Sequence, residues 1–402
     1  MVYITVLILI FLYVKNRKGF KMGNKIDIII PAYKAQKTIL RTVSSIAEQT
    51  IKDDLEVTIV NDACPNGDYH EIVSMFSPYI SIREIKLDVN GGPGVARQFG
   101  IDATHNPYFT CIDADDTFAG TNALEILRTA IEEPVIIQNR QIPEAYQAVS
   151  STFLQLSDDV RRIVPHQNDM VWMFGKIYRR KFIDKYKIRF NETRANEDTG
   201  FNTIVRLLCT NPQEQLRFIP EATYYWHNKV DSITRINDGQ YGYDQCFCGW
   251  TDNMIYAIEH VKHIRPFDGG VAQWSASCLI NLYFYYIECY ARKRFFALQD
   301  WEYVKKFYNR IYSKIADDIS DEALAELFSM ASAEKYTSRS LIGIIPHIGV
   351  HEFLDKLKKE VYDPDDIYKV WAKMQDTEEG RQLMLNNVTC GVCPDNYWVK
   401  NE

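Results

Sequence analysis

Residues 107–118 read Pro-Tyr-Phe-Thr-Cys-Ile-Asp-Ala-Asp-Asp-Thr-Phe, and the fold of the N-terminal half can be worked out from them. The apolar run 108–112 is typical of a short buried strand, and three acids follow it. Carboxylates crowded at a strand end repel one another and lose solvation unless a cation binds there. Asp113, Asp115 and Asp116 therefore indicate either a solvated acidic turn or a site for Mg²⁺ or Mn²⁺, placed where open α/β sheets bind ligands.

The segments before this stretch alternate between two hydrophobic patterns. Short apolar runs predict strands at 26–30, 55–60 and 82–87. Apolar residues at helical spacing predict helices at 35–49, 68–76 and 95–104. Four strands separated by helices within roughly 90 residues are the pattern of a parallel sheet covered on both faces. The sequence therefore predicts an α/β fold.

Residues suited to a nucleotide follow several of these strands. Tyr33 can stack on a base, Asp62 can accept a hydrogen bond from a uracil N–H or a ribose hydroxyl, and Arg97 can bind a phosphate near a helix N-terminus. Taken singly, each residue could have a purely structural role: Tyr33 as a packed ring, Asp62 as an acid in a turn and Arg97 as a capping residue. Their joint position at successive carboxyl ends predicts a nucleotide site. The chain lacks G-x-G-x-x-G and P-loop motifs, which disfavours dinucleotide dehydrogenases and P-loop enzymes.

Composition narrows the class of protein. The chain has 402 residues, 46% hydrophobic and 25% charged, with a net charge of −7. This length suits two or three domains, and the acidic balance disfavours a protein that coats nucleic acid. Nine cysteines, mostly scattered singly, are typical of a reducing compartment. Cys246, Cys248, Cys390 and Cys393 could supply four zinc ligands, but nothing in the sequence brings the two pairs together, so ordinary thiols are favoured.

Residues 1–14 are almost wholly apolar and precede a basic flank, Lys15, Arg17, Lys18 and Lys21. The run is shorter than the ~20 residues that span a bilayer, and it lacks the features of a cleaved signal. Met22 is an alternative start, which would leave residues 1–22 outside the folded protein. The prediction is a cytoplasmic enzyme, with membrane association through the apolar segment as the alternative, since the basic flank would keep the rest cytoplasmic.

A series of short motifs follows in order between residues 25 and 235. They are Ile-Ile-Ile-Pro-Ala-Tyr-Lys at 28–34, Val-Asn-Asp-Ala at 60–63, Asn-Gly-Gly-Pro-Gly-Val-Ala-Arg-Gln at 90–98 and Asp-Ala-Asp-Asp at 113–116. Gly-Lys-Ile-Tyr-Arg-Arg at 175–180, Asn-Glu-Asp-Thr at 196–199, Tyr-Trp-His-Asn at 225–228 and Asp-Ser-Ile-Thr-Arg at 231–235 come next. This combination resembles the family 2 glycosyltransferases of GT-A fold.

The resemblance implies an α/β GT-A domain, with a Rossmann-like, mixed but mainly parallel sheet and helices on both faces. The rest of the chain matches none of these motifs, and its hydrophobic patterns predict an α-helical C-terminal domain. The expected divisions are a leader at 1–22, a nucleotide-sugar half at 23–135, an acceptor half at 136–237 and a helical domain at 238–402. Helices are expected at 254–261, 276–290, 301–315, 321–331 and 351–361. This last domain would form part of the acceptor site or a homo-oligomer contact.

The resemblance also implies a donor site for a nucleoside-diphosphate sugar, here predicted to be a UDP-sugar. The residues that would line the nucleotide are Pro31, Ala32, Tyr33, Asp62 and Arg97, with Asp113 toward the ribose or sugar. Asp115 would hold Mn²⁺ or Mg²⁺, which stabilises the leaving diphosphate. The D-x-D pair stays ambiguous because Asp116 follows directly. His227, as a neutral imidazole, is either a further metal or diphosphate ligand or a packed residue of an aromatic strand.

Catalysis and acceptor binding are assigned by the same resemblance. Asp198, with Glu197 as its rival, would be the general base of an inverting transfer to a hydroxyl. The alternative is that these acids only begin a helix at 199–209 capped by Asn196. Ser232 and Arg235 would bind phosphate from a mobile loop. Trp172 and Lys176 would lie on the acceptor side, where an indole can stack on a sugar ring.

The expected acceptor is a polysaccharide or a lipid-linked glycan. A hydroxylated base in DNA is the alternative acceptor, although the acidic net charge counts against it. A nucleotidyltransferase would carry a glycine-rich loop with a basic residue after the first strand, where Pro31, Ala32 and Tyr33 stand instead. An inactive binding module is disfavoured because the acids at 113, 115 and 198 are intact.

Overall fold

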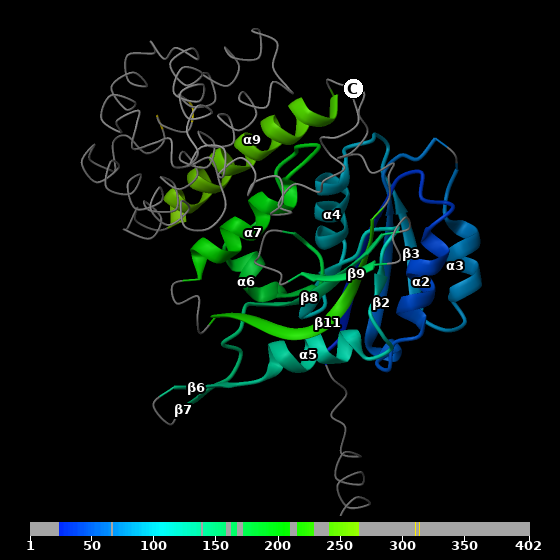
Figure 1. Cartoon of the computed structure of the whole chain (residues 1–402), viewed down its shortest axis with the longest axis horizontal. Coiled ribbons are helices and arrows are strands. Elements are labelled where there is room, and N and C mark those ends of the chain that lie inside the picture. Colours follow the sequence, from blue (N-terminus) through cyan, green and yellow to red (C-terminus); the bar gives the residue numbers. More distant parts are fainter. Residues whose placement is uncertain are drawn as a thin grey trace, which may run out of the picture. The chain divides into compact units, whose positions relative to one another are not determined.

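The computed structural model describes residues 24–65, 67–137, 140–157, 162–166, 172–209, 215–228 and 241–264, together with residues 310 and 313 (Figure 1). The chain divides into two compact units. The first comprises Met1–Arg189 and Asn211–Asn228, and the second comprises Phe190–Thr210 and Lys229–Glu402. The leader predicted at 1–22 lies outside the described residues.

A nine-stranded sheet forms the centre of the first unit, in the order β3-β2-β1-β4-β10-β8-β11-β5, with β9 paired to β8. Four parallel strands make up one half: β1 (Ile26–Ala32), β2 (Leu55–Asn61), β3 (Ser81–Lys86) and β4 (Tyr108–Cys111). The other half comprises β5 (Thr117–Phe118), β8 (Ala148–Ser157), β9 (Arg162–His166), β10 (Lys176–Arg179) and β11 (Leu216–Asn228). There β8 and β11 are parallel, and the remaining pairs are antiparallel.

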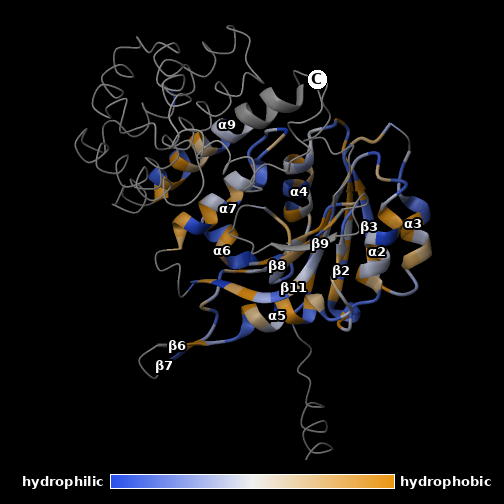
Figure 2. Ribbon diagram, viewed as in Figure 1, coloured by the Kyte–Doolittle hydropathy of each residue, from blue (hydrophilic) through white to orange (hydrophobic). Residues whose placement is uncertain are grey.

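The four strands predicted from the sequence are confirmed as β1 to β4. β1, β2 and β4 are buried almost throughout, whereas the residues of β3, at the edge of the sheet, are exposed or half-buried. Helices α2 (Ile39–Ala47), α3 (His70–Phe76) and α4 (Pro93–Asp102) alternate with them. Helix α5 (Ala123–Glu132) contacts β8, β10 and β11, whereas α4 contacts β1 and β2. Hydrophobic residues run along the central strands, and the helices mix hydrophobic and hydrophilic residues (Figure 2). The smaller elements are η1 (Lys52–Asp54), α6 (Arg180–Lys185) and the hairpin of β6 (Val135–Ile137) and β7 (Arg140–Ile142).

The second unit contains two described helices, α7 (Glu197–Leu208) and α9 (Tyr241–Ile264), which contact each other. A side chain at Gly200 would clash with Asn253, so glycine permits this close approach. The amide of Asn253 donates to Gly249 O at 2.7 Å and to Thr193 Oγ1 at 2.7 Å. The helix predicted at 254–261 lies within α9, and those predicted at 276–290, 321–331 and 351–361, with nearly all of 301–315, lie outside the described residues.

Three cysteines have described side chains. Cys64, Cys111 and Cys209 are buried, and none of them forms a disulfide bond. Burial raises the pKa of Cys111 and of Cys209 to about 12, so both thiols stay protonated at neutral pH. The side chains of the two predicted zinc-ligand pairs lie outside the described residues. None of the described helices combines the length and the apolar character needed to cross a membrane.

A buried ion pair joins the start of β1 to α6. The carboxylate of Asp27 accepts from Arg180 Nη2 at 2.8 Å and from both nitrogens of Asn106, at 2.8 Å from N and 2.6 Å from Nδ2. The same guanidinium donates to the carbonyls of Ile101 and Asn106 and to Thr104 Oγ1. Because every partner is a buried or half-buried polar group, removal of one member leaves a charge without compensation.

We expect Arg180→Met to lower the free energy of unfolding of the protein by about 3–5 kcal/mol, because it leaves the Asp27 carboxylate buried without its cation. Urea denaturation followed by circular dichroism measures the change. The matched control is Arg189→Met, whose ion pair with Asp102 is about half exposed and should contribute no more than about 1 kcal/mol. Equal losses in the two variants would contradict the assignment.

Candidate functional site

The candidate donor residues lie where three neighbouring parallel strands end. β1 lies between β2 and β4, and Ala32 at the end of β1 is opposite Asn61 on β2. Pro31 and Ala32 end β1, Tyr33 follows with 43% of its surface exposed, and Asp62 comes directly after β2. The structure therefore places the predicted nucleotide-side residues at one edge of the sheet, because carboxyl ends of parallel strands meet there.

Asp62 organises the loop that leads into α4. Its carboxylate accepts from the backbone N–H groups of Gly91 at 2.7 Å and Gly92 at 2.8 Å, and from Asn90 Nδ2 at 2.9 Å. Gly92 has φ +89°, a conformation that favours glycine. Only 3% of Asp62 is exposed. Three of about four acceptor positions of the carboxylate are used, which leaves one for a ligand.

Asn90 was not predicted as a site residue. Its amide donates both to the carbonyl of Asp62, at 3.1 Å, and to the Asp62 carboxylate. The signal in the sequence was the Asn-Gly-Gly turn after the third strand, which we interpreted only as a loop.

Arg97 and Asp113 form an ion pair across the ends of α4 and β4. Arg97 Nη2 lies 2.6 Å from Asp113 Oδ1, and the Asp113 side chain is 30% exposed, whereas that of Arg97 is buried. This contact brings the predicted phosphate ligand and the first acid of the turn together. The guanidinium compensates part of the negative charge at the strand end.

Asp116 is turned toward the sheet interior. Its carboxylate accepts from Tyr224 Oη at 2.7 Å and from the backbone N–H of His227 at 2.8 Å. Burial, together with the negative charges of Asp113 and Asp115, raises the pKa of Asp116 well above that of an ordinary carboxyl group. Asp116 thus bridges the turn to β11, whereas Asp113 and Asp115 are only half-buried.

Helix α2 supports the acidic turn from the other side. Arg41 Nη2 donates to the backbone carbonyl of Asp115, and Thr42 Oγ1 donates to that of Asp116 at 2.8 Å. His227 Nε2 lies 3.0 Å from Thr117 Oγ1, so the imidazole lies beside the turn. The backbone of the turn is therefore held between α2 and β11.

The side chains at the acidic turn can be compared with the ligands that Mg²⁺ or Mn²⁺ requires. In the part of the chain that the structure describes, no three His, Cys, Asp or Glu side chains are grouped to bind a metal ion. The half-buried carboxylates of Asp113 and Asp115 nevertheless fit a cation that takes one or two carboxylates from the protein and its other ligands from substrate phosphates and water.

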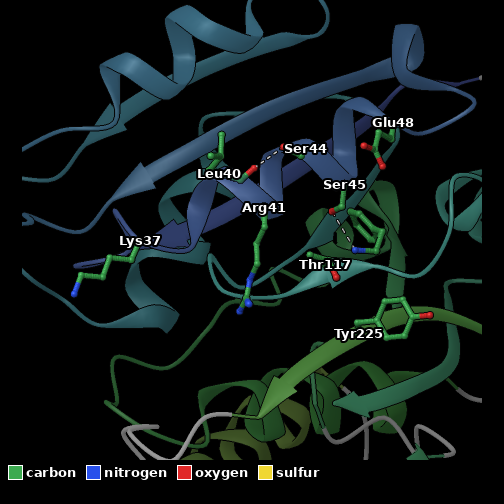
Figure 3. Close-up of a pocket in the computed structure, with 9 residues that line it drawn as sticks. Lys37, Leu40, Arg41, Ser44, Ser45, Glu48, Thr117 and Tyr225 are labelled. Atoms are coloured by element: carbon green, nitrogen blue, oxygen red, sulfur yellow. Dashed lines mark hydrogen bonds between the residues drawn. The ribbon is translucent and has the colours of Figure 1, made fainter. Parts of the chain in front are cut away.

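A pocket of about 550 Å³ opens between α2, β5 and the end of β11 (Figure 3). Its polar lining comes from α2 and the residues that flank this helix, and comprises Lys37, Arg41, Ser44, Ser45 and Glu48; the other lining residues are Leu40, Thr117, Phe118 and Tyr225. Ser45 Oγ accepts from the backbone N–H of Phe118 at 3.2 Å, and Ser44 Oγ donates to Leu40 O at 2.8 Å. The serines thus stabilise α2 and its contact with β5.

The candidate general bases lie in the second unit, on the first turn of α7. Asp198 Oδ1 accepts from the backbone N–H of Thr199 at 2.7 Å, and Glu197 is buried. Asn196 stands at the N-cap position of α7, as the sequence suggested, but the predicted start of the helix at Thr199 is two residues too late. The helix begins at Glu197, and Asn196, at φ 59°, makes no capping hydrogen bond through its side chain. Its left-handed backbone differs from the extended conformation usual for a capping residue.

The predicted acceptor residues have different environments. Trp172 is 40% exposed, whereas Lys176 lies fully buried in β10, between β4 and β8. Helices α5 and α6 pack against this central strand. Ser232 and Arg235 lie outside the described residues.

Comparisons with known proteins agree with this arrangement. Residues 27–191 match the family described as Glycosyl transferase family 2. The succinoglycan biosynthesis protein ExoO of Rhizobium meliloti is 24% identical over 226 residues, 52% of this chain and 63% of that protein. Poly(ribitol-phosphate) beta-N-acetylglucosaminyltransferase TarP of Staphylococcus aureus is 24% identical over 44% of this chain and 56% of its own length. The chain thus spans less than two thirds of the length of these curated relatives.

The fold also matches a crystal structure, that of S. aureus TarS 1-349 in complex with UDP-GlcNAc. The TM-score is 0.58 at 17% identity, over 75% of this chain and 83% of that one. At this identity the likeness establishes the fold alone. Residues 27–191 are therefore similar to the family 2 glycosyltransferases, and the first unit has a GT-A-like fold.

Proposed function

We propose that the protein transfers a sugar from a UDP-sugar to a hydroxyl group of a polysaccharide, with inversion at the anomeric carbon. One observation carries this proposal. The ends of β1, β2 and β4 bring an exposed aromatic ring, Tyr33, a carboxylate with an acceptor position left, Asp62, and the acidic turn to one edge of the sheet. Tyr33 would stack on the base, Asp62 would accept a hydrogen bond from the base or the ribose, and the acidic turn would lie at the diphosphate.

The relatives support the substrate classes. The name of ExoO refers to succinoglycan biosynthesis, TarP is named for a poly(ribitol-phosphate) acceptor, and TarS was crystallised with UDP-GlcNAc. Each name describes that relative. For this chain they favour a nucleotide-sugar donor and a polymeric acceptor. Asp62 favours uracil among the bases, because its remaining acceptor position can take the ring N–H.

Asp115 is the residue that would bind the metal ion, with Asp113 beside it and His227 as a further candidate. Such an ion supplies Lewis-acid stabilisation of the departing diphosphate. Arg97 orients Asp113 and adds positive charge at the same place. Asp116 is excluded from this set in the proposal, because its oxygens are committed to Tyr224 and His227.

Asp198 is assigned as the general base. Its position on the first turn of α7 places the carboxylate at the positive end of the helix dipole, which favours the ionised form. An ionised carboxylate can take the proton of the acceptor hydroxyl while its oxygen attacks the anomeric carbon opposite the diphosphate. The buried Glu197 is the alternative base.

Removal of metal by a chelator and the substitution Asp115→Asn test whether the reaction requires a metal ion bound at Asp115. Release of UDP from a panel of UDP-sugars with Mn²⁺ should vanish on addition of a chelator, and the variant should lose at least about 100-fold in kcat, as expected when a group that stabilises developing charge is removed. Asp53→Asn, an exposed acid on η1, is the control and should retain activity. Full activity of wild-type protein in chelator would refute the metal assignment.

Asp198→Asn should lower kcat by about 10²–10⁴-fold, the usual contribution of a general base, without weakening UDP binding. Steady-state transfer rates and calorimetric titration with UDP give the two quantities. Glu197→Gln is the comparison variant. A larger loss of kcat in Glu197→Gln than in Asp198→Asn would transfer the role of base to Glu197.

Asp62→Asn should weaken UDP binding by roughly tenfold or more, because an amide has a single acceptor oxygen for the two backbone N–H groups of Gly91 and Gly92 and a buried donor left without a partner costs about 1–3 kcal/mol. Calorimetry of UDP binding measures the loss. Asn90→Ala keeps both backbone contacts and should lose less. Equal effects of the two substitutions would mean that loop geometry does not depend on the carboxylate.

A further inference from the structure

Two neighbouring loops at the proposed donor edge contain backbone conformations that non-glycine residues rarely adopt. Lys34, in the loop after β1, has φ 53°, and Ala63, in the loop after β2, has φ 51°. A left-handed backbone costs free energy for a residue with a Cβ atom, and it persists where surrounding contacts maintain it, often at ligand sites. The two loops are joined, because the backbone N–H of Asp62 donates to the carbonyl of Ala32 at 3.0 Å. The contacts that maintain this backbone therefore bear on donor binding.

The side chain of Cys64 contacts the loop after β1. Its sulfur accepts from the backbone N–H of Lys34 at 3.3 Å and from Gln36 Nε2 at 3.2 Å. Cys64 is only 4% exposed. A neutral thiol is a weak acceptor, but a buried or half-buried N–H group without any acceptor is destabilising. The sulfur thus supplies an acceptor to the backbone just beyond the end of β1, at the residue with the left-handed conformation.

Tyr69 supplies the acceptor for the next peptide group. Its buried hydroxyl accepts from the backbone N–H of Ala35 at 3.1 Å. Burial raises the pKa of the Tyr69 hydroxyl well above its ordinary value, and a hydrogen bond with Cys64 adds to the rise. The hydroxyl therefore stays protonated, so it can donate to the sulfur of Cys64 while it accepts from Ala35. Cys64 and Tyr69 act together on consecutive peptide groups of one loop.

Both side chains are themselves fixed by polar partners. Asn61 Oδ1 accepts from the backbone N–H of Cys64 at 2.9 Å, and Asn61 Nδ2 donates to Glu84 Oε1 at 2.7 Å. Glu84 Oε2 accepts from the backbone N–H of Tyr69 at 2.9 Å. The hydrogen bonds are continuous from β3 to the loop after β1, and such satisfied networks make a structure rigid. Asn61, Cys64, Tyr69 and Glu84 are called the loop support below.

The position of Tyr33 depends on the loop support through Lys34. Tyr33 is 43% exposed, and Lys34 Nζ lies over its ring, 5.1 Å from the centroid. Because the ring and the ammonium group belong to adjacent residues, the backbone conformation of Lys34 determines how they lie. Cys64 and Tyr69 are buried, so they influence this ring through the backbone of the loop rather than through a ligand.

We propose that Cys64 and Tyr69 are positioning residues of the donor site, which keep the loop at 33–36 in its left-handed conformation and so present Tyr33 to the base before the nucleotide binds. This inference rests on the proposed UDP-sugar site. A loop that is ordered in advance loses less conformational entropy on binding, which strengthens binding without any new contact to the ligand. Since Tyr33 would contact the base, the effect concerns the nucleoside rather than the number of phosphates.

The first experiment measures nucleotide binding in variants of Cys64. Cys64→Ala should raise the Kd for UDP and the KM for the UDP-sugar by roughly fivefold with kcat unchanged, because the ordered loop strengthens ground-state and transition-state binding equally. The Kd for UMP should rise by the same factor. Cys64→Ser, which keeps an acceptor, should restore most of the affinity. The matched control is Cys209→Ala, which removes a buried thiol from the second unit and should leave the Kd for UDP unchanged.

A double-mutant cycle separates positioning of Tyr33 from a general structural role. Tyr33→Ala removes the ring that the loop presents, so adding Cys64→Ala to it should change the Kd for UDP by less than about twofold, since residues that act through one contact are not additive. Tyr69→Phe, which loses the acceptor for the backbone N–H of Ala35, should behave in the same way. An equal loss of affinity with and without the Tyr33 ring would overturn the proposal.

Amide hydrogen exchange tests the loop without any ligand. Exchange of the peptide that covers residues 33–36 should be at least about tenfold faster in Cys64→Ala and in Tyr69→Phe than in the wild type, because local opening is easier, and close to the wild-type rate in Cys64→Ser. Unchanged exchange in Cys64→Ala would overturn the role of the thiol. If the wild-type protein binds no uracil nucleotide, the proposed donor site falls, and faster exchange would still show that Cys64 orders the loop.

Discussion

The carboxylate of Asp116 is the group on which the geometry of the site depends. It accepts from the hydroxyl of Tyr224 and from the backbone N–H of His227, and so connects the acidic turn after β4 to strand β11. A buried carboxylate is stable only when it is hydrogen-bonded, so these two contacts determine how the turn lies. Asp113 and Asp115 are only half-buried, and the ring of Tyr224 stacks on that of Phe174.

Charge at the turn is compensated by contacts from several elements. Arg97 of α4 pairs with Asp113, and Arg41 of α2 donates to the carbonyl of Asp115. Burial, together with the negative charges of Asp113 and Asp115, raises the pKa of Asp116. A divalent cation between Asp115 and a diphosphate would relieve this repulsion, which is a physical reason why a turn of this composition suits a metal-assisted transfer.

The two sides of the proposed site are built differently. On the donor side, backbone N–H groups of the loop at 90–92 converge on Asp62, and the side chains that would contact the nucleotide come from strand ends. On the side of β11 the contacts are between ring faces, because Phe174 stacks on Tyr224 and on Trp226. Polar, directional contacts of the kind found at Asp62 suit a base and a diphosphate.

The sequence by itself determined the parallel half of the sheet. The alternation of apolar strands with amphipathic helices is a local signal, and β1 to β4 lie within one or two residues of their predicted positions. It also determined that Tyr33, Asp62 and Asp113 belong to one edge, because carboxyl ends of neighbouring parallel strands coincide. The antiparallel half has no comparable periodic pattern, and its strands were not all predicted.

Only the tertiary structure decided which acid of the turn faces inward, why Lys176 is buried, and that Asn90 supports Asp62. Each answer depends on a partner distant in the sequence. Asp116 and Tyr224 are 108 residues apart, and Asn90 and Asp62 are 28 residues apart. The order of strands in the sheet brings such partners together, and neither hydrophobic periodicity nor capping preferences encode that order. Local patterns therefore predict the elements, whereas their packing determines what each side chain can do.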